Sequence, residues 1–384
     1  MPATRSPHPH QDRRIVILGG GYAALGAVST LSALAPESGV TLIAPRKAHI
    51  KITHLHETLR YSLRRLCILY EDLAERFGFH FIQGKLRFDT DSLLRWQQRR
   101  VIRLDGREIP FDGLIVATGA DYGGTHNPTR VLTVHDFCLN RGQTMVRDLC
   151  KQGGKTAELS VVGGGATGMQ FLFELSSYLK RKGRRGWKLR LINYEQRVLG
   201  QFPDCFYHYA LERMLRESIE YFPSSAFLRQ EDDVMVIRRR DGNDEYRLPS
   251  QLTLLFPGVK PTPVPIMTNR FGQVLAKGEI LDRIFAAGDC ARFEGAGANT
   301  LSAQVALRKG KAVASNLLCR AAGQEMRPYV YAEHGYFVSL GPNDGIGWLE
   351  TKENILTGHS AAVIKTAIEK QYDLLLAGID TYAP

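Results

Sequence analysis

The sequence lacks long hydrophobic runs, closely paired cysteines and an apolar start. No stretch approaches about 18 uninterrupted apolar residues, which argues against a membrane-spanning helix. The six cysteines are scattered without a Cys-x-x-Cys pair, so we expect neither a disulfide framework nor a metal site. Because residues 1–11 are polar, we expect a short disordered tail, no export signal and a cytoplasmic protein.

Acidic residues are in deficit. The chain has 50 Lys and Arg residues against 39 Asp and Glu, a net charge of +11. This charge suits nucleic acid, an anionic membrane surface or phosphorylated small molecules. The densest basic run, Lys180–Arg190, has no zinc-finger or aromatic RNA-binding motif beside it. We interpret the run as a solvated helix end and turn, so nucleic acid is a disfavoured partner.

Hydrophobic strand patterns alternate with helical ones and predict an α/β fold built from parallel βαβ units. The strands are expected at 14–18, 40–44, 113–117, 159–162 and 188–193, and the helices at 22–35, 167–182 and 205–217. A hairpin should turn at 241–243, and a late helix should begin near Thr300 or Ser302.

Two glycine-rich turns each lie between a strand and a helix. In a G-x-G-x-x-G turn the first glycine permits the tight turn and the second lets backbone N–H groups approach a pyrophosphate. The third position allows close packing of helix on strand. These positions hold Gly19, Gly21 and Ala24 in the first turn and Gly163, Gly165 and Gly168 in the second. One such turn is weak evidence, but two in this context predict two dinucleotide sites.

The acidic residue that usually follows the next strand and binds a ribose diol is missing from both units. Ala44 stands there in the first unit and Asn193 in the second. Asparagine can still hydrogen-bond a ribose hydroxyl, and Arg46 or Arg197 could meet a phosphate. The choice between NADH and NADPH therefore stays open.

Four features together resemble a known superfamily. Besides the two dinucleotide folds, the segments LIVATGA and RIFAAGDCA are similar to those of the two-dinucleotide-binding-domain flavoproteins, the pyridine nucleotide-disulfide oxidoreductases. Within them the chain most resembles type II NADH:quinone dehydrogenases and the ferroptosis-suppressor and apoptosis-inducing-factor-like oxidoreductases. The resemblance implies two Rossmann-like domains in a glutathione-reductase-like fold. It places an FAD domain at 12–125 and 256–327, an NAD(P)H domain at 126–255, and a C-terminal portion at 328–384 that closes the active site.

The resemblance also implies the cofactors, FAD at the first turn and NADH or NADPH at the second. The residues that would bind FAD are Gly19, Gly21, Tyr22, Ala23, Ala24, Arg46, Thr118, Gly119, Asp289 and Ala303. Those that would bind NAD(P)H are Gly163, Gly165, Ala166, Thr167, Gly168 and Asn193. The helix that begins near Ser302 would direct its partly positive N-terminus at the flavin and stabilise the charge that builds up on reduction. Gln304 is the side chain expected to face the ring.

The segment Ile52–Leu59 corresponds to one that runs beside the flavin in relatives. We expect His54 and His56 on one face of an extended segment, where either could orient an acceptor or supply a proton. Quinone-reducing relatives carry a glutamate where this chain has Gln170, and Glu174 matches a second family acid. A family glutamine is replaced by Arg308. Because glutamine cannot relay a proton, Gln170 leaves the acceptor open.

The main prediction is an FAD-dependent NAD(P)H oxidoreductase that passes electrons to a quinone-like or other small acceptor. The alternatives are an apoptosis-inducing-factor-like redox sensor and a specialised biosynthetic oxidoreductase. A sulfide:quinone reductase is disfavoured because Cys290 has no evident partner cysteine.

An apolar stripe near the C-terminus favours a docking helix over a membrane-surface helix. It consists of Ile364, Ile368, Tyr372, Leu375 and Ile379. Peripheral contact with an anionic membrane stays open, and so does a homodimer.

Overall fold

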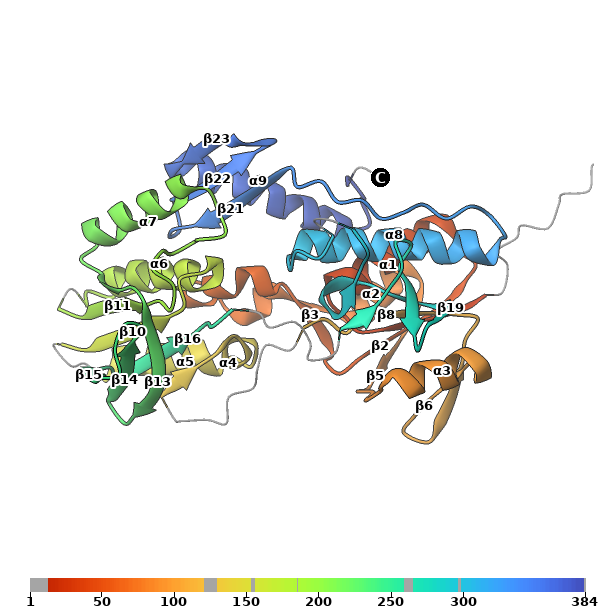
Figure 1. Ribbon diagram of the computed structural model, residues 1–384, viewed down its shortest axis with the longest axis horizontal. Helices are drawn as coiled ribbons and strands as arrows, with labels where there is room; N and C mark the ends of the chain where they lie inside the picture. The colour runs from red at the N-terminus through yellow and green to blue at the C-terminus, as the bar shows by residue number, and fades with distance from the viewer. Residues whose placement is uncertain are drawn as a thin grey trace, which may run out of the picture.

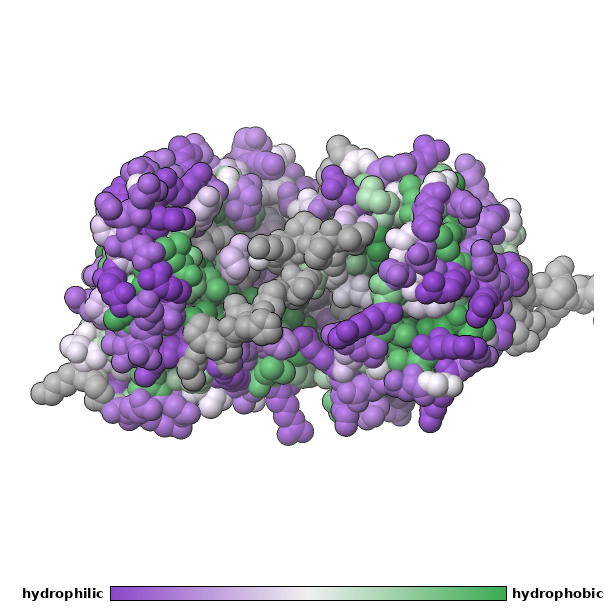
Figure 2. Space-filling model, turned by 60° about the horizontal axis from the view of Figure 1, so that its bottom comes forward, coloured by the Kyte–Doolittle hydropathy of each residue, from purple (hydrophilic) through white to green (hydrophobic). Residues whose placement is uncertain are grey.

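The computed structural model describes residues 13–120, 130–152, 156–184, 186–258, 265–295 and 298–382. Figure 1 shows two α/β halves side by side, with the C-terminal elements lying along one edge of both. Figure 2 shows that hydrophilic residues cover much of one face, with smaller hydrophobic patches on both halves. The predicted tail at 1–11 lies outside the described residues.

The first half is built on a six-stranded sheet in the order β18-β19-β8-β1-β2-β5. All neighbouring strands run parallel except β18 and β19. The strands are β1 (Arg14–Leu18), β2 (Gly39–Ala44), β5 (Phe79–Gln83), β8 (Gly113–Val116), β18 (Gln273–Ala276) and β19 (Glu279–Ala286). The two last strands come from late in the chain, so the sheet is completed only after the second half has been traversed.

Two long helices cover one face of this sheet, α1 (Tyr22–Leu34) and α8 (Ala303–Ala321). Figure 1 shows them lying against each other. A Cβ at Gly310 would lie 1.9 Å from the carbonyl oxygen of Ala23, so the two backbones touch where the helices cross. Smaller elements complete the half: β3 (Ala48–Ile50), η1 (Ile52–Leu59), η2 (Leu63–Leu66), β4 (Cys67–Leu69), α2 (Tyr70–Phe77), α3 (Thr90–Arg99), β6 (Val101–Leu104), β7 (Arg107–Pro110), β17 (Ile266–Met267), η3 (Gly288–Cys290) and β20 (Ala291–Arg292).

The second half is built on a parallel five-stranded sheet in the order β12-β11-β10-β16-β9. Its strands are β9 (Val131–Leu132), β10 (Glu158–Val162), β11 (Lys188–Ile192), β12 (Glu220–Phe222) and β16 (Leu252–Leu255). Its helices are α4 (Val134–Cys138), α5 (Arg141–Lys151), α6 (Ala166–Arg181) and α7 (Asp204–Arg216). An antiparallel sheet of β13 (Ser225–Glu231), β14 (Val234–Arg239) and β15 (Glu245–Pro249) contains the predicted hairpin, with Arg238 paired to Glu245.

The C-terminal portion joins the two halves. An antiparallel sheet of β21 (Gly335–Ser339), β22 (Gly345–Leu349) and β23 (Thr351–Thr357) packs Val338, Ile346 and Trp348 into the core of the second half. Helix α9 (Gly358–Leu376) then carries Tyr372 and Leu375 into the core of the first half. Figure 1 shows α9 crossing between them.

The stripe on α9 is shorter than predicted, because the helix ends at Leu376 and Ile379 beyond it is 55% exposed. None of the helices in the described part of the chain is both long and apolar enough to span a bilayer.

The alternation of strands and helices predicted from the sequence is confirmed, with element ends shifted by about one residue. The expectation of an extended segment at 52–59 is wrong, because η1 is a 3-10 helix. The spacing of His54 and His56 suggested an extended strand, but the backbone does not adopt one here. The turns of this 3-10 helix bury Leu55 and Leu59 in the core of the second half. The exact domain limits stay predictions, and two of them lie close to residues outside the described part.

Candidate active site

The first glycine turn is shaped by close backbone contacts. Gly19 has φ +113° and donates its N–H to the Ile43 carbonyl at 2.8 Å. A Cβ there would lie 2.1 Å from the Ala117 carbonyl oxygen, so only glycine fits. Gly21 begins α1 without a side-chain cap, and no atom of the described residues lies within 4 Å of the place its Cβ would take. The first N–H groups of α1 thus receive no cap from Gly21, and no described atom crowds its Cβ position.

The second turn repeats this geometry. Gly163 has φ +107° and donates its N–H to the Ile192 carbonyl at 2.8 Å. A Cβ there would lie 2.0 Å from the Phe256 carbonyl oxygen. Gly165 begins α6 without a side-chain cap, again with open space at its Cβ position. We call the two turns, residues 19–24 and 163–168, the first and second cradles. Uncapped N–H groups at a helix start that a ligand can approach closely suit a pyrophosphate.

The first cradle is braced by aromatic side chains. The Gly20 carbonyl accepts hydrogen bonds from the Tyr70 hydroxyl at 2.6 Å and from Nδ1 of His49 at 3.0 Å. Burial lowers the pKa of His49 to about 4, so the ring is neutral near pH 7. With Nδ1 donating to a carbonyl, Nε2 accepts from the Tyr372 hydroxyl at 2.9 Å. Helix α9 thereby helps to hold the first cradle.

The second cradle is braced by one amide. Oδ1 of Asn193 accepts the Gly164 N–H at 2.8 Å, and its Nδ2 donates to the carbonyls of Glu195 at 2.7 Å and Arg197 at 3.0 Å. The chain's own backbone thus uses all the polar atoms of this amide, and a ribose contact by Asn193 stays a prediction. Arg197 is paired with Asp204 at 2.7 Å. In the cradle itself, Ala166 is half-buried and Thr167 is exposed.

Two further predicted segments meet the first cradle. A Cβ on Gly19 would also touch the backbone N of Thr118, and Gly119 turns the chain away with φ +77°. A Cβ on Gly288 would lie 2.9 Å from Cβ of Ala23, which brings η3 and Asp289 to the same place. Ala24 is fully buried beneath the turn, whereas Arg46 is exposed beyond β2.

A buried lysine, which the sequence analysis missed, stands beside Asp289. Burial raises the pKa of Asp289, and the charge of Lys309 opposes that shift. Lys309 is 2% exposed and donates to the carbonyl of Ala291 at 3.0 Å and to Oδ1 of Asn299 at 3.3 Å. Burial lowers its pKa to about 8. The sequence pattern of α8 gave no sign that this lysine turns inward.

Helix α8 begins where it was expected. Oγ of Ser302 accepts the Val305 N–H at 3.2 Å and caps the helix. Ala303 and Gln304 are half-buried in the first turn. The Gln304 amide has no hydrogen bond to any residue in the described ranges, which leaves it available to a ligand.

A chain of polar side chains runs from the first cradle to α9. The Tyr22 hydroxyl lies 3.0 Å from Oγ1 of Thr53, which lies 3.0 Å from Nδ1 of His54. Nε2 of His54 lies 3.2 Å from a carboxylate oxygen of Glu369, which also pairs with Lys365. Burial raises the pKa of Glu369, but the hydrogen bond and the charges of His54 and Lys365 outweigh it and hold it at about 2. Glu369 is therefore ionised at neutral pH.

His56 turns the other way, so the prediction of one shared face is wrong. Its ring is 3% exposed and lies edge-on to Phe171 of α6, with the centroids 6.3 Å apart. Burial lowers its pKa well below the ordinary value. In the 3-10 helix, residues two apart point in different directions, so the two histidines contact different elements.

Helix α6 carries Gln170 and Glu174. Gln170 is half-buried, two residues beyond the second cradle. Glu174 is fully buried, and Nε of Arg60 lies 2.8 Å from its Oε1. Neither of its oxygens accepts a well-aligned hydrogen bond from a described residue. Burial raises the pKa of Glu174 to about 7, against the charge of Arg60. Glu174 is thus a carboxylate able to change protonation near neutral pH, one turn from Gln170.

The cysteines form no disulfide, and one cluster of the described residues has the spacing of metal ligands. All six cysteines are free, and the buried Cys290 thiol donates to the Ala287 carbonyl at 3.3 Å. Within the described residues, one group has the spacing of metal ligands: His54, Glu57 and Glu369. Arg60 and Lys365 already pair with its two carboxylates, which fits an ion-pair network.

Comparison with known proteins places these features in context. A model of the pyridine nucleotide-disulphide oxidoreductase family matches residues 13–310. The type II NADH:quinone oxidoreductases of Staphylococcus saprophyticus and Staphylococcus aureus are each 24% identical over 96% of this chain and 97% of their own. A structure of the sulfide:quinone oxidoreductase of Aquifex aeolicus has a TM-score of 0.78 at 18% identity, covering 97% of this chain and 93% of that one.

A structure of NDH2 from Plasmodium falciparum in complex with NADH has a TM-score of 0.76 at 14% identity and covers 94% of each chain. At such identities the likeness of the structures concerns the fold. It confirms the prediction of two Rossmann-like dinucleotide-binding units.

Proposed function

The chain belongs to the pyridine nucleotide-disulphide oxidoreductase family, and on that premise we propose that it oxidises NADH or NADPH and passes the electrons through FAD to a quinone-like acceptor. The observation that carries the proposal is the pair of cradles with matched geometry. Two uncapped helix starts, each facing open space at its second glycine, suit two pyrophosphates in one molecule.

We assign FAD to the first cradle and NAD(P)H to the second. Gly21 and the start of α1 would bind the FAD pyrophosphate, and Gly165 with the start of α6 would bind that of NAD(P)H. Thr118, Gly119 and Asp289 gather around the first cradle and would hold the rest of FAD. When bound, FAD supplies a carrier that accepts two electrons from a nicotinamide and releases them to a second substrate.

The N-terminus of α8 would stabilise negative charge near the first cradle. It presents unpaired N–H groups and a partial positive charge of about one half of a unit. Because Ser302 caps only one N–H and the Gln304 amide is unused, both the backbone and this side chain can donate to an anionic edge of a ligand. The donors are fixed in advance, which avoids reorganisation when charge builds up.

The polar chain Tyr22–Thr53–His54–Glu369 would deliver protons to an acceptor. Quinone reduction consumes protons, and Gln170 cannot provide them. His54 is held between Thr53 and the ionised Glu369, an arrangement that orients the ring. Support for a quinone comes from the staphylococcal relatives, whose names specify a quinone.

The proposal is tested by reoxidising the reduced protein with a soluble quinone in a stopped-flow instrument. His54→Gln should slow this step roughly a hundredfold, the scale of general acid catalysis, and should leave reduction by NADH or NADPH unchanged. His80→Gln, on the exposed side of β5, is the matched control.

If quinone reoxidised both variants at the same rate, His54 would not be the proton donor. A reduced wild-type protein that no quinone reoxidises would instead favour a redox-sensing role.

A further inference from the structure

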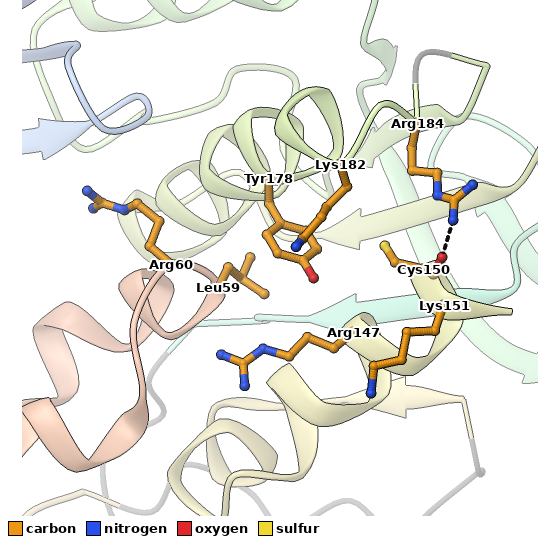
Figure 3. A pocket seen from close by; sticks show the side chains of 8 residues that line it. All are labelled: Leu59, Arg60, Arg147, Cys150, Lys151, Tyr178, Lys182 and Arg184. Atoms are coloured by element: carbon orange, nitrogen blue, oxygen red, sulfur yellow. Dashed lines mark hydrogen bonds between the residues drawn. The ribbon is translucent and has the colours of Figure 1, made fainter. Parts of the chain in front are cut away.

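A basic pocket lies where the end of η1 meets the second half, near the end of α6 that is remote from the second cradle. It has a volume of about 390 Å³ and is lined by the end of η1, by α5 and by the end of α6. Figure 3 shows the side chains that line it: Leu59, Arg60, Arg147, Cys150, Lys151, Tyr178, Lys182 and Arg184. Gly165 and Lys182 mark opposite ends of α6, about 26 Å apart at 1.5 Å per residue. The pocket is therefore separate from the second cradle.

Five of the eight lining residues are cations, and no carboxylate is among those described. Two of them are already paired: Lys151 with Asp148 at 3.0 Å, and Arg60 with Glu174. Arg147, Lys182 and Arg184 have no carboxylate partner within the described residues. Concentrating three unneutralised charges in one concave place is unfavourable unless an anion joins them.

Hydrogen bonds to backbone carbonyls fix the guanidinium groups of Arg147 and Arg184. Arg147 donates to the Thr58 carbonyl at 3.1 Å, and Arg184 donates to the Cys150 carbonyl. Nε of Arg184 is buried and has no hydrogen-bond partner among the described residues. Figure 3 shows Lys182 reaching back over the Tyr178 ring, with its Nζ 5.8 Å from the ring centroid. Guanidinium groups fixed by backbone carbonyls lose little entropy on binding a phosphate.

The pocket is larger than one phosphate and has an apolar floor. Leu59, Tyr178 and Cys150 are all buried and supply that floor. A volume of this size lies in the range of small-molecule sites. A ligand with at least two negative charges on phosphate and an apolar remainder fits such a lining.

We propose that this pocket binds a phosphate-bearing anion, presented either by a soluble phosphorylated molecule or by a lipid headgroup. The assignment gives part of the basic run Lys180–Arg190 a role, because Lys182 and Arg184 both belong to it. It does not depend on the proposed redox function.

Calorimetry on the FAD-loaded protein tests the inference, with inorganic pyrophosphate as the probe at fixed ionic strength. NAD⁺ is added in excess to fill the second cradle. The double variant Lys151→Glu/Lys182→Glu should bind pyrophosphate roughly tenfold more weakly or worse, the loss expected for charged hydrogen bonds. The control Arg87→Glu/Arg107→Glu changes net charge equally on exposed residues of the first half and should bind as the wild type does.

A second arm distinguishes the source of the phosphate. Flotation with phosphatidylcholine vesicles is compared with flotation on vesicles that also contain phosphatidylglycerol. Binding of the anionic vesicles that the pocket variant loses and the control keeps would assign the site to a lipid headgroup. The inference is overturned if the wild type binds neither probe, or if the pocket variant binds as well as the control.

Discussion

The two cradles follow one backbone plan and differ in what surrounds them. In each, a glycine with positive φ lies against a carbonyl of the neighbouring strand, and a second glycine starts a helix in open space. The first cradle is covered by α8, which touches α1 backbone to backbone, and is braced through His49 and Tyr70. The second cradle is braced by the amide of Asn193.

This difference suits two kinds of ligand. A cofactor that stays bound benefits from a cradle tied to distant parts of the chain, as His49 ties it to Tyr372 of α9. A nucleotide that enters and leaves in each turnover needs a cradle that holds its shape alone. Asn193 provides that from within the same unit. Four predictions test the comparison, in order of expected effect.

The largest effect is expected at the covered cradle. In Gly310→Ala, the new Cβ would lie 1.9 Å from the Ala23 carbonyl oxygen. Because this oxygen belongs to the backbone of α1, it cannot move away without shifting the helix. We expect a loss of about 3 kcal/mol in the free energy of unfolding and release of FAD. Melting temperature and flavin content measure the two effects. Gly242→Ala, whose Cβ would meet nothing within 4 Å, is the control; equal melting of the two variants would contradict the close crossing.

Low pH should also destabilise the first cradle. His49 has a folded-state pKa of about 4 against an ordinary 6.5, so the folded protein binds fewer protons than the unfolded chain between these values. Its contribution to stability is present above pH 6.5 and is lost as pH falls towards 4, by about 3 kcal/mol at the acid end. Melting curves should show this slope in the wild type and a flatter one in His49→Gln. Parallel slopes would remove His49 as the cause.

A smaller effect is expected at the second cradle. Asn193→Ala removes three hydrogen bonds to the backbone, at a cost of about 2 kcal/mol. Binding of NADH and NADPH should weaken while FAD is retained, which calorimetry and flavin absorbance report separately. Asn354→Ala, an exposed amide that donates once to the Leu349 carbonyl, is the control. Loss of FAD from Asn193→Ala would contradict the assignment of FAD to the first cradle and NAD(P)H to the second.

The smallest effect is the most specific. In Gly165→Ala the added Cβ has no atom of the described residues within 4 Å, so stability should stay within about 0.5 kcal/mol of the wild type. The methyl would occupy the space meant for a pyrophosphate, and the Kd for NAD(P)H should rise roughly tenfold. Gly21→Ala should instead weaken FAD retention. If both variants affected the same nucleotide, the assignment of one cradle to each would be wrong.

The cradles could be predicted from sequence because their geometry is local. A strand, a glycine at the tight turn and a helix lie within a dozen residues, and the same holds for the Ser302 cap. The braces could not be predicted. His49 and Tyr372 are 323 residues apart, and their meeting depends on α9 crossing between the halves. The 3-10 helix at 52–59 was missed for a similar reason, because the core that buries Leu55 belongs to the other half.

The basic pocket shows the same limit. The run Lys180–Arg190 is visible in the sequence, but Arg147 and Arg60, which complete the pocket, come from other elements. A charge run gives no sign of whether the fold will spread it over the surface or gather it with other cations.

The most direct test is the absorbance of the purified protein under anaerobic conditions. We predict a yellow protein whose flavin band bleaches when NADH or NADPH is added, and bleaches much more slowly at the same nucleotide concentration in Gly165→Ala. A colourless protein that takes up no flavin, or a flavin band that neither nucleotide bleaches, would contradict the account.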